Sequence, residues 1–258
     1  MKISVYNTYS PYLSRNKVPH FGSTARSYAD KSGLAIGNHT SIYRNDIEWD
    51  KLAEYIVKNF KDKEKVNIEQ YACSDGSESY TIILSLLKAA QNKNIRKFFP
   101  IKAFDIDNEV ITKAAQEGII NLEEKDLERL KTNGFKSEEF FTKSDKRLWL
   151  KQESLYFTGK TYNVSQYLQD KVMFDKGNMF VEIGNLKDNS NTVLFCRNIL
   201  LYMDDCEHQY FIEKAGEKLK KGSLLVIGTL DRDSNYLEKY LHQYGFAPVM
   251  KNVYKKMN

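Results

Sequence analysis

The sequence predicts an α/β fold with a doubly wound, mostly parallel sheet. Short runs rich in β-branched and aromatic residues alternate with segments of helical period over most of the chain. Parallel strands need a crossover long enough to hold a helix, and right-handed crossovers cover both faces of the sheet. Sheets of this kind bind ligands at the carboxyl ends of their strands, so functional residues are expected there.

The elements are expected in a regular order. A first helix begins near Ile47, with Asn45 or Asp46 as its N-cap, and its apolar positions are Trp49, Leu52, Ile56 and Phe60. Strands are predicted at 66–72, 101–105, 171–174, 192–196 and 223–228, and helices at 77–90, 108–116, 205–219 and 235–244. A pair of short strands at 247–255 is expected to end the chain.

Length and composition favour one main domain. The chain has 258 residues, 41% of them hydrophobic and 28% charged, which is typical of a globular protein. Residues 1–45 are polar and Tyr-rich and are interpreted as an arm that contributes to the site, whereas 46–258 form the domain. The net charge of +5 comes from faces of mixed sign, so nucleic acid is not an expected partner.

The sequence also predicts a cytoplasmic protein without a membrane-inserted segment. Its beginning lacks the apolar run of a secretory signal, and no stretch approaches the ~20 apolar residues of a membrane helix. Cys73, Cys196 and Cys206 are widely spaced and form no C-x-x-C pair, so reduced thiols and no metal site are expected.

The turn after the first strand is a candidate ligand site. Gly76 is expected to let the backbone approach a ligand, and the helix that follows offers unpaired N–H groups. Glu78 in the first helical turn suits a ligand with cationic groups, such as the ammonium and sulfonium of S-adenosylmethionine. The alternative is an ordinary strand-to-helix turn.

Two further strand ends carry polar residues. Asp105 ends the second strand, where an ionised carboxylate can accept from both hydroxyls of a ribose, and Asp107 is expected to cap the next helix. Asn198 and Tyr202 follow the strand 192–196. The Asn/Asp-Pro-Pro-Tyr motif, which is typical of enzymes that methylate nitrogen, is absent from this strand end. Asn198 and Tyr202 are interpreted as holding a methyl donor and flanking the path of attack; a loop Asn and a packed Tyr are the alternative.

These segments together resemble the CheR family of chemotaxis-receptor protein-glutamate O-methyltransferases, which are Rossmann-like class I enzymes. Five blocks match in order, and Phe-Cys-Arg-Asn is the most specific of them. The blocks are 38–44 (NHTSIYR), 73–81 (CSDGSESYT), 103–107 (AFDID), 172–174 (VMF) with 178–179 (NM), and 195–198 (FCRN) with Tyr202.

The resemblance implies a set of site residues. The S-adenosylmethionine site would be lined by Asn38, Thr40, Arg44, Glu78, Asp105, Asn178, Met179, Arg197 and Asn198. Arg44 and Tyr202 would act on the acceptor, and the product would be S-adenosylhomocysteine. Residues 121–170 occupy the place of the family's small β-subdomain, which can dock a receptor tail, so this insertion is expected to recognise a partner protein. The alternative is that the aromatic residues of the insertion only pack it against the rest of the domain.

The chain departs from the family pattern at several positions. Only 37 residues precede Asn38, too few for the family's N-terminal helical domain, so a role in chemotaxis is not implied. Ser77 and Ser79 replace a Glu and a Pro, and a Gly-His-Ser-Glu block is replaced by the residues at 228–231 (GTLD).

The expected reaction is displacement of a methyl group from a sulfonium by a glutamate carboxylate of a partner protein. A carboxylate is already nucleophilic at neutral pH, so alignment by Arg44 and Tyr202 suffices without a strong base. His208 is accordingly expected at the surface. The alternatives are a methyltransferase with a small-molecule acceptor and a non-catalytic module that binds S-adenosylmethionine.

Overall fold

The computed structural model describes residues 40–91, 94–146, 159–187, 191–233 and 237–258. They fall into two compact units, a first unit within Gly37–Gly177 and a second unit within Asn178–Asn258. No helix in these ranges is long and apolar enough to cross a membrane.

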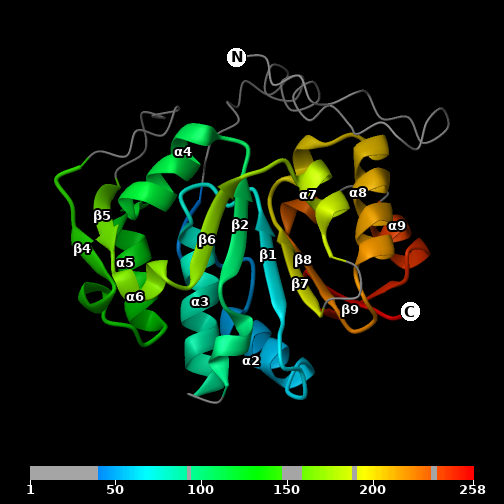
Figure 1. Ribbon diagram of the computed structural model, residues 1–258, viewed down its shortest axis with the longest axis horizontal. Helices are drawn as coiled ribbons and strands as arrows, with labels where there is room; N and C mark the ends of the chain where they lie inside the picture. The colour runs from blue at the N-terminus through cyan, green and yellow to red at the C-terminus, as the bar shows by residue number, and fades with distance from the viewer. Residues whose placement is uncertain (1–39, 92–93, 147–158, 188–190, 234–236) are drawn as a thin grey trace. The chain divides into compact units, whose positions relative to one another are not determined.

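The first unit is built on three parallel strands in the order β6-β2-β1. Their bounds are β1 (Asn67–Tyr71), β2 (Ile101–Asp105) and β6 (Val172–Lys176). Ala103 of β2 lies opposite Gln70 on one side and Phe174 on the other. Because the strands are parallel, their carboxyl ends meet at one edge (Figure 1). Asp105 is the last residue of β2 and therefore lies at that edge.

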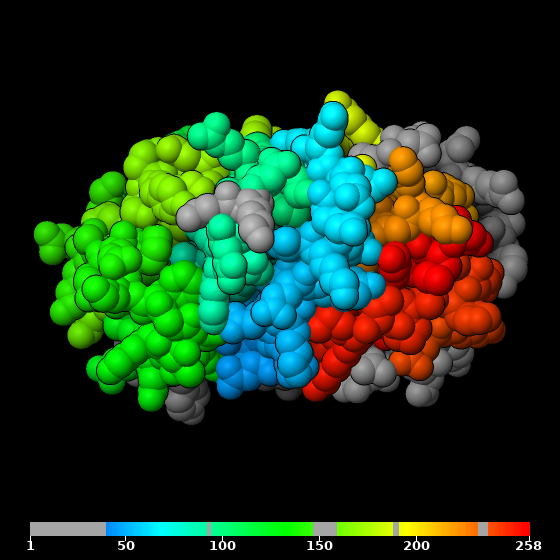
Figure 2. All heavy atoms as spheres, turned by 90° about the horizontal axis from the view of Figure 1, so that it is seen from below, coloured from blue at the N-terminus to red at the C-terminus, as the bar shows by residue number. Residues whose placement is uncertain are grey.

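Two helices of the first unit pack against each other, α2 (Trp49–Asn59) and α3 (Ser77–Ala90). The expected apolar positions of α2 are buried, and part of its charged outer face is visible in blue in Figure 2. Neither Asn45 nor Asp46 caps the helix, because it begins later, after Glu48. The indole of Trp49 donates to the carbonyl of Arg44, at 3.0 Å, so the chain before the helix is folded into a turn.

The helix expected at 108–116 is present but less regular than predicted. It consists of α4 (Asn108–Thr112) and a π-helical turn (Lys113–Glu117), ended by Gly118 at φ 58°. As predicted, Asp107 caps it by accepting a hydrogen bond from the backbone N–H of Glu109, at 3.0 Å.

A three-stranded antiparallel sheet in the order β3-β5-β4 lies where the family resemblance implied a small β-subdomain, although its individual strands were not predicted. The elements of this region are β3 (Ile119–Leu122), α5 (Glu124–Thr132), β4 (Phe141–Lys143), β5 (Lys160–Val164) and α6 (Gln166–Gln169). Helix α5 begins with a reciprocal cap between Glu123 and Asp126. The sheet begins at Ile119, slightly before the insertion predicted at 121–170.

The second unit has strands in the order β7-β8-β10-β9, of which β7 and β8 are parallel and β10 is antiparallel to both its neighbours. Its elements are α7 (Met179–Asn185), β7 (Thr192–Cys196), α8 (Asp205–Lys218), β8 (Leu224–Ile227), α9 (Leu237–Gln243), β9 (Phe246–Met250) and β10 (Val253–Lys256). Helix α8 packs against α7 and α9 (Figure 1). The predicted α/β fold with mostly parallel strands is confirmed, and it is Rossmann-like.

Candidate functional site

The turn between β1 and α3 has an unusual backbone. Ala72 and Ser74 adopt positive φ angles of 57° and 52°, and Gly76 follows at 87°. Such conformations cost non-glycine residues about 1–3 kcal/mol each and persist where surrounding contacts hold them, often at functional sites. A Cβ at Gly76 would lie 2.5 Å from Cζ of Phe174, so glycine is needed here both for the positive φ and for the close approach of this ring.

The carboxylate of Asp105 holds this turn in place. Its Oδ2 accepts from the backbone N–H of Ser74 at 2.7 Å, and its Oδ1 accepts from the backbone N–H of Asp107 at 2.9 Å. Asp105 is 6% exposed, and burial raises the pKa of its carboxyl while these hydrogen bonds oppose the rise. A carboxylate has about four acceptor positions, so these bonds fix its orientation while it can still accept from a ligand.

Asp75 is a buried polar residue of this turn that the sequence did not single out. Its Oδ1 accepts from both the backbone N–H and the hydroxyl of Ser77, and its Oδ2 accepts from the backbone N–H of Asn121 in β3, at 3.1 Å. Burial raises the pKa of Asp75 to about 6, and the bonds from Ser77 and Asn121 oppose the rise. The Asp-x-Ser spacing of an Asx turn was the available signal.

The block at 38–44, called the arm block below, belongs to the first unit. Ile42 and Tyr43 are buried, and the backbone N–H of Tyr43 donates to the Thr81 hydroxyl of α3 at 3.0 Å. Thr40 and Arg44, on either side, are half-buried. Asn38 lies outside the described residues.

Ser41 joins the arm block to α5. Its hydroxyl donates to Oδ1 of Asp126 at 2.6 Å and accepts from the guanidinium of Arg129. Asp126 also closes the cap of α5 by accepting from the backbone N–H of Glu123 at 3.0 Å. The block that carries Thr40 and Arg44 is therefore tied to the beginning of this helix.

In the second unit, Asn178 and Met179 open helix α7. The side-chain oxygen of Asn178 accepts from the backbone N–H of Phe180 at 2.9 Å, which makes Asn178 the N-cap. Both Asn178 and Met179 are 6% exposed. The capping role is a structural reason for an Asn here, in addition to the role implied by the resemblance.

Arg197, Asn198 and Tyr202 lie in one short segment after β7. Arg197 is buried, Asn198 and Tyr202 are half-buried, and Tyr202 ends a 3₁₀ turn that begins at Leu200. Asn198 has a φ of 56°, so a strained residue follows β7 as it follows β1.

A second buried carboxylate, Asp231, organises the segment after β7 and was also missed. It accepts from the backbone N–H groups of Gly228, Asn198 and Leu201. Burial raises the pKa of Asp231, while these three bonds and the charge of Arg197 oppose the rise. The available signal was an acidic residue three positions after Gly228.

His208 is not at the surface, contrary to the prediction. It is 4% exposed, and its Nε2 lies 2.7 Å from the carbonyl oxygen of Leu200. Its position in the first turns of α8, directly after the 3₁₀ turn, explains this contact.

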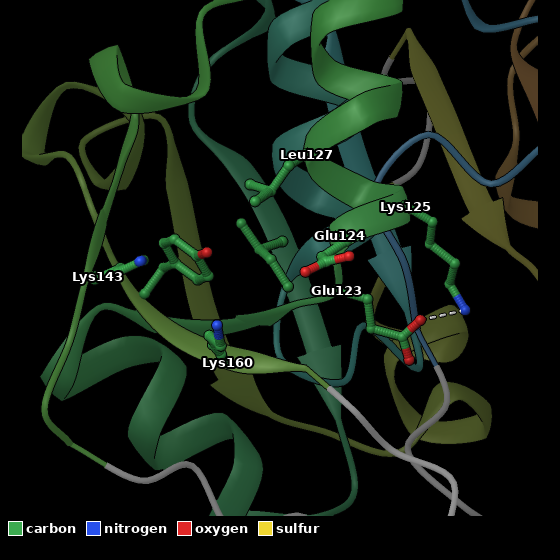
Figure 3. Close-up of a pocket in the computed structure, with 8 residues that line it drawn as sticks. Glu123, Glu124, Lys125, Leu127, Lys143 and Lys160 are labelled. Carbon is green, nitrogen blue, oxygen red and sulfur yellow. Dashed lines mark ion pairs between the residues drawn. The ribbon is translucent and has the colours of Figure 1, made fainter.

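A pocket of about 610 Å³ lies between α5 and the three-stranded sheet. Figure 3 shows Glu124 and Leu127 of α5 on one side and Lys143 of β4 and Lys160 of β5 on the other. Glu123 forms an ion pair with Lys125 at its rim. The lining residues are Leu122, Glu123, Glu124, Lys125, Leu127, Lys143, Lys160 and Tyr162.

Several aromatic residues of this region serve packing. Phe135 stacks on Tyr43 at 6.2 Å between centroids, and Phe141 meets Tyr80 of α3 edge-on at 6.3 Å. Tyr167 is instead 52% exposed, beneath the ammonium of Lys171. Among the other aromatic residues of the insertion predicted at 121–170, Phe140 packs against Phe135 and Tyr162 is buried. Trp149, Tyr156 and Phe157 lie outside the described residues.

Comparison with known proteins identifies the relatives of this chain. Residues 38–242 match the family described as CheR methyltransferase, SAM binding domain. The chemotaxis protein methyltransferase 2 of Vibrio cholerae is 27% identical over 197 residues, which cover 74% of this chain and 61% of that protein. The chemotaxis protein methyltransferase of Borreliella burgdorferi is 26% identical over 197 residues, covering 74% of this chain and 63% of that protein.

A third relative is named for a process other than chemotaxis. The probable biofilm formation methyltransferase WspC of Pseudomonas aeruginosa is 24% identical over 178 residues, covering 69% of this chain and 35% of that protein. This chain thus spans less than two thirds of the length of each of the three relatives.

Proposed function

Because this chain belongs to the CheR methyltransferase family, we propose that it transfers a methyl group from S-adenosylmethionine to a glutamate carboxylate of a partner protein. Two of the relatives named above are chemotaxis protein methyltransferases, which supports a protein acceptor. A cytoplasmic location is part of the proposal, supported by the three free cysteines, which suit a reducing compartment.

The observation that carries the proposal is the fixed carboxylate of Asp105 at the end of β2. Backbone N–H groups of Ser74 and Asp107 hold both its oxygens, and a carboxylate has about four acceptor positions in all, so it can also accept from a hydroxyl. A ribose with two adjacent hydroxyls fits such an acceptor. Glu78, half-buried in the first turn of α3, would interact with the cationic groups of the same ligand.

The remaining donor-binding residues are assigned through the family match. Thr40 and Arg44 belong to the first unit, together with Asn38, which lies outside the described residues. Asn178, Met179, Arg197 and Asn198 belong to the second unit, where they lie at the start of α7 and at the end of β7. Arg44 is also assigned to the acceptor, with Tyr202.

The residues of this chain would promote the reaction by alignment. S-Adenosylmethionine supplies a methyl group on a positively charged sulfur, so a C–O bond to the acceptor forms as the C–S bond breaks and neutral S-adenosylhomocysteine leaves. The guanidinium of Arg44 would orient the acceptor carboxylate by paired hydrogen bonds, and the Tyr202 hydroxyl would steer the attacking oxygen. No proton has to be removed, because the acceptor is already ionised.

The insertion 121–170 is proposed to recognise the partner protein. The pocket beside α5 supports this role, because two exposed lysines, Lys143 and Lys160, and the apolar Leu127 line one hollow. That combination suits a peptide with an acidic and an apolar side chain. Phe135 and Phe141 are committed to packing, so the proposal rests on the pocket and not on these rings.

Calorimetric titration with S-adenosylhomocysteine tests the donor site. The wild-type chain is expected to bind, and Asp105→Asn should weaken binding about 10- to 100-fold, since a charge-assisted hydrogen bond contributes about 1.5–3 kcal/mol. Asp107→Asn is the matched control, because Asp107 caps α4 two residues away. Tyr202→Phe should leave binding within about threefold of wild type and slow turnover.

Two results would contradict the proposal. Absence of binding at high micromolar ligand would exclude a methyltransferase with any acceptor. It would also exclude a non-catalytic module that binds S-adenosylmethionine. Equal loss of binding in Asp105→Asn and Tyr202→Phe would contradict the division between donor and acceptor residues.

A second candidate function is methylation of another acceptor, such as a small molecule. It is kept because one relative, the probable biofilm formation methyltransferase WspC, is named for a process other than chemotaxis. A non-catalytic module that binds S-adenosylmethionine would bind the ligand without turnover, so turnover separates it from both enzymes.

A further inference from the structure

The Asp231 side chain connects the ends of two neighbouring strands of the second unit. Its Oδ2 accepts from the backbone N–H of Gly228, after β8, and from that of Asn198, after β7, both at 2.7 Å. Its Oδ1 accepts from the backbone N–H of Leu201 at 3.2 Å. Asp231 is 0% exposed, so these backbone groups satisfy the buried carboxylate.

The segment that Asp231 holds needs external support. Asn198 adopts a left-handed backbone conformation at φ 56°, which persists only where neighbouring groups impose it. His208 supplies a second contact, between its Nε2 and the carbonyl oxygen of Leu200. Two buried side chains, from the turn after β8 and from α8, therefore bind the backbone of one short segment.

The space around this carboxylate is filled. A Cβ at Gly228 would lie 2.8 Å from both the backbone nitrogen of Asn198 and Oδ2 of Asp231, and closer still to the Asn198 side-chain oxygen. Gly228 therefore allows the two loops to approach each other closely enough for one carboxylate to bridge them.

We propose that Asp231 is a positioning residue for methyl transfer, which fixes the backbone of Asn198 and Leu201 and thereby the side chains of Asn198 and Tyr202. This inference rests on the proposed function, which assigns Asn198 to the methyl donor and Tyr202 to the acceptor. A single carboxylate suits the task because it has about four acceptor positions for N–H groups, whereas an amide has two.

Two variants of Asp231 give a graded test. Asp231→Ala removes all three acceptor bonds, whereas Asp231→Asn can keep the two bonds at Oδ2 if its amide oxygen takes that place. Asp204→Ala is the matched control, because it removes the exposed N-cap of α8, which accepts from the backbone N–H of Glu207, and leaves the Asp231 contacts in place. Each variant is titrated with S-adenosylhomocysteine, and hydrogen exchange is followed at the amides of Asn198 and Leu201.

The dissociation constant for S-adenosylhomocysteine is expected to rise at least about tenfold in Asp231→Ala and by an intermediate factor in Asp231→Asn. In Asp204→Ala it should stay within about twofold of the wild-type value. Exchange at Asn198 and Leu201 should accelerate in Asp231→Ala but not in Asp204→Ala. Equal affinity of Asp231→Ala and Asp204→Ala for S-adenosylhomocysteine would overturn the inference. Unchanged exchange at the amides of Asn198 and Leu201 in Asp231→Ala would also overturn it. If the wild-type chain bound no ligand, the proposed function would fail, and the exchange rates would still decide whether Asp231 holds the segment.

Discussion

Three buried carboxyl groups of this chain, Asp75, Asp105 and Asp231, accept hydrogen bonds from backbone N–H groups of turns that follow strands. The turns after β1 and β7 contain non-glycine residues at positive φ, namely Ala72, Ser74 and Asn198. Backbone polar groups that are buried in turns need partners, and a charged acceptor is a strong one. Carboxylates thus stabilise the strained strand ends that the proposed function uses.

Asp75 predicts a pH dependence of stability. Its pKa is about 6 in the folded chain, against roughly 3.9 for an unfolded Asp, so the folded state binds more protons between these values. Its contribution to stability is therefore fully present below about pH 4 and is lost as the pH rises through about 6, a change of about 3 kcal/mol.

Denaturant unfolding from pH 4 to pH 7 checks this contribution. The difference in unfolding free energy between wild type and Asp75→Asn should shift in favour of the variant as the pH rises. Asp145→Asn, at an exposed site, controls for the loss of one carboxylate. A difference that does not change with pH would contradict the burial-driven rise in the pKa of Asp75.

At the scale of secondary-structure elements, the sequence predicted the helices and strands that have strong local signals. The bounds predicted for α3, β2 and β7 agree with the structure, because apolar runs there are flanked by clear turn residues. Strands β3 and β5 were missed because they are short and pair only with distant segments. The start of α2 was wrong because a turn held by the Arg44 carbonyl and the Trp49 indole delays the helix.

The proposed binding role of the insertion predicts a selective defect. Lys143→Ala combined with Lys160→Ala removes the two lysines that the sheet contributes to the pocket and is expected to lower methyl incorporation into a protein acceptor about tenfold. Affinity for S-adenosylhomocysteine should stay unchanged. Lys131→Ala, an exposed lysine of α5 outside the pocket, is the matched control. Equal incorporation by the double variant and the control would contradict the binding role.

At the scale of the whole molecule, the fold class and the family followed from the order of the strands and from a few short blocks. Asp105 was predicted as a site residue because it ends a predicted strand, and Asn198 because it follows one; the structure places both at strand ends. Asp75 and Asp231 were missed because their partners, Asn121 and the backbone N–H groups of Asn198 and Leu201, are distant in sequence. Hydrogen bonds of this kind leave no periodic pattern in a sequence.

Transfer of a labelled methyl group tests the central claim most directly. The wild-type chain is incubated with S-adenosylmethionine labelled in the methyl group and with a lysate as the source of acceptor proteins. A carboxyl methyl ester releases its label as volatile methanol in mild alkali, whereas an N-methyl group does not. The account predicts protein-bound label that is released by alkali and that is lost with Asp105→Asn. Label that survives alkali, or incorporation that is equal with Asp105→Asn, would contradict it.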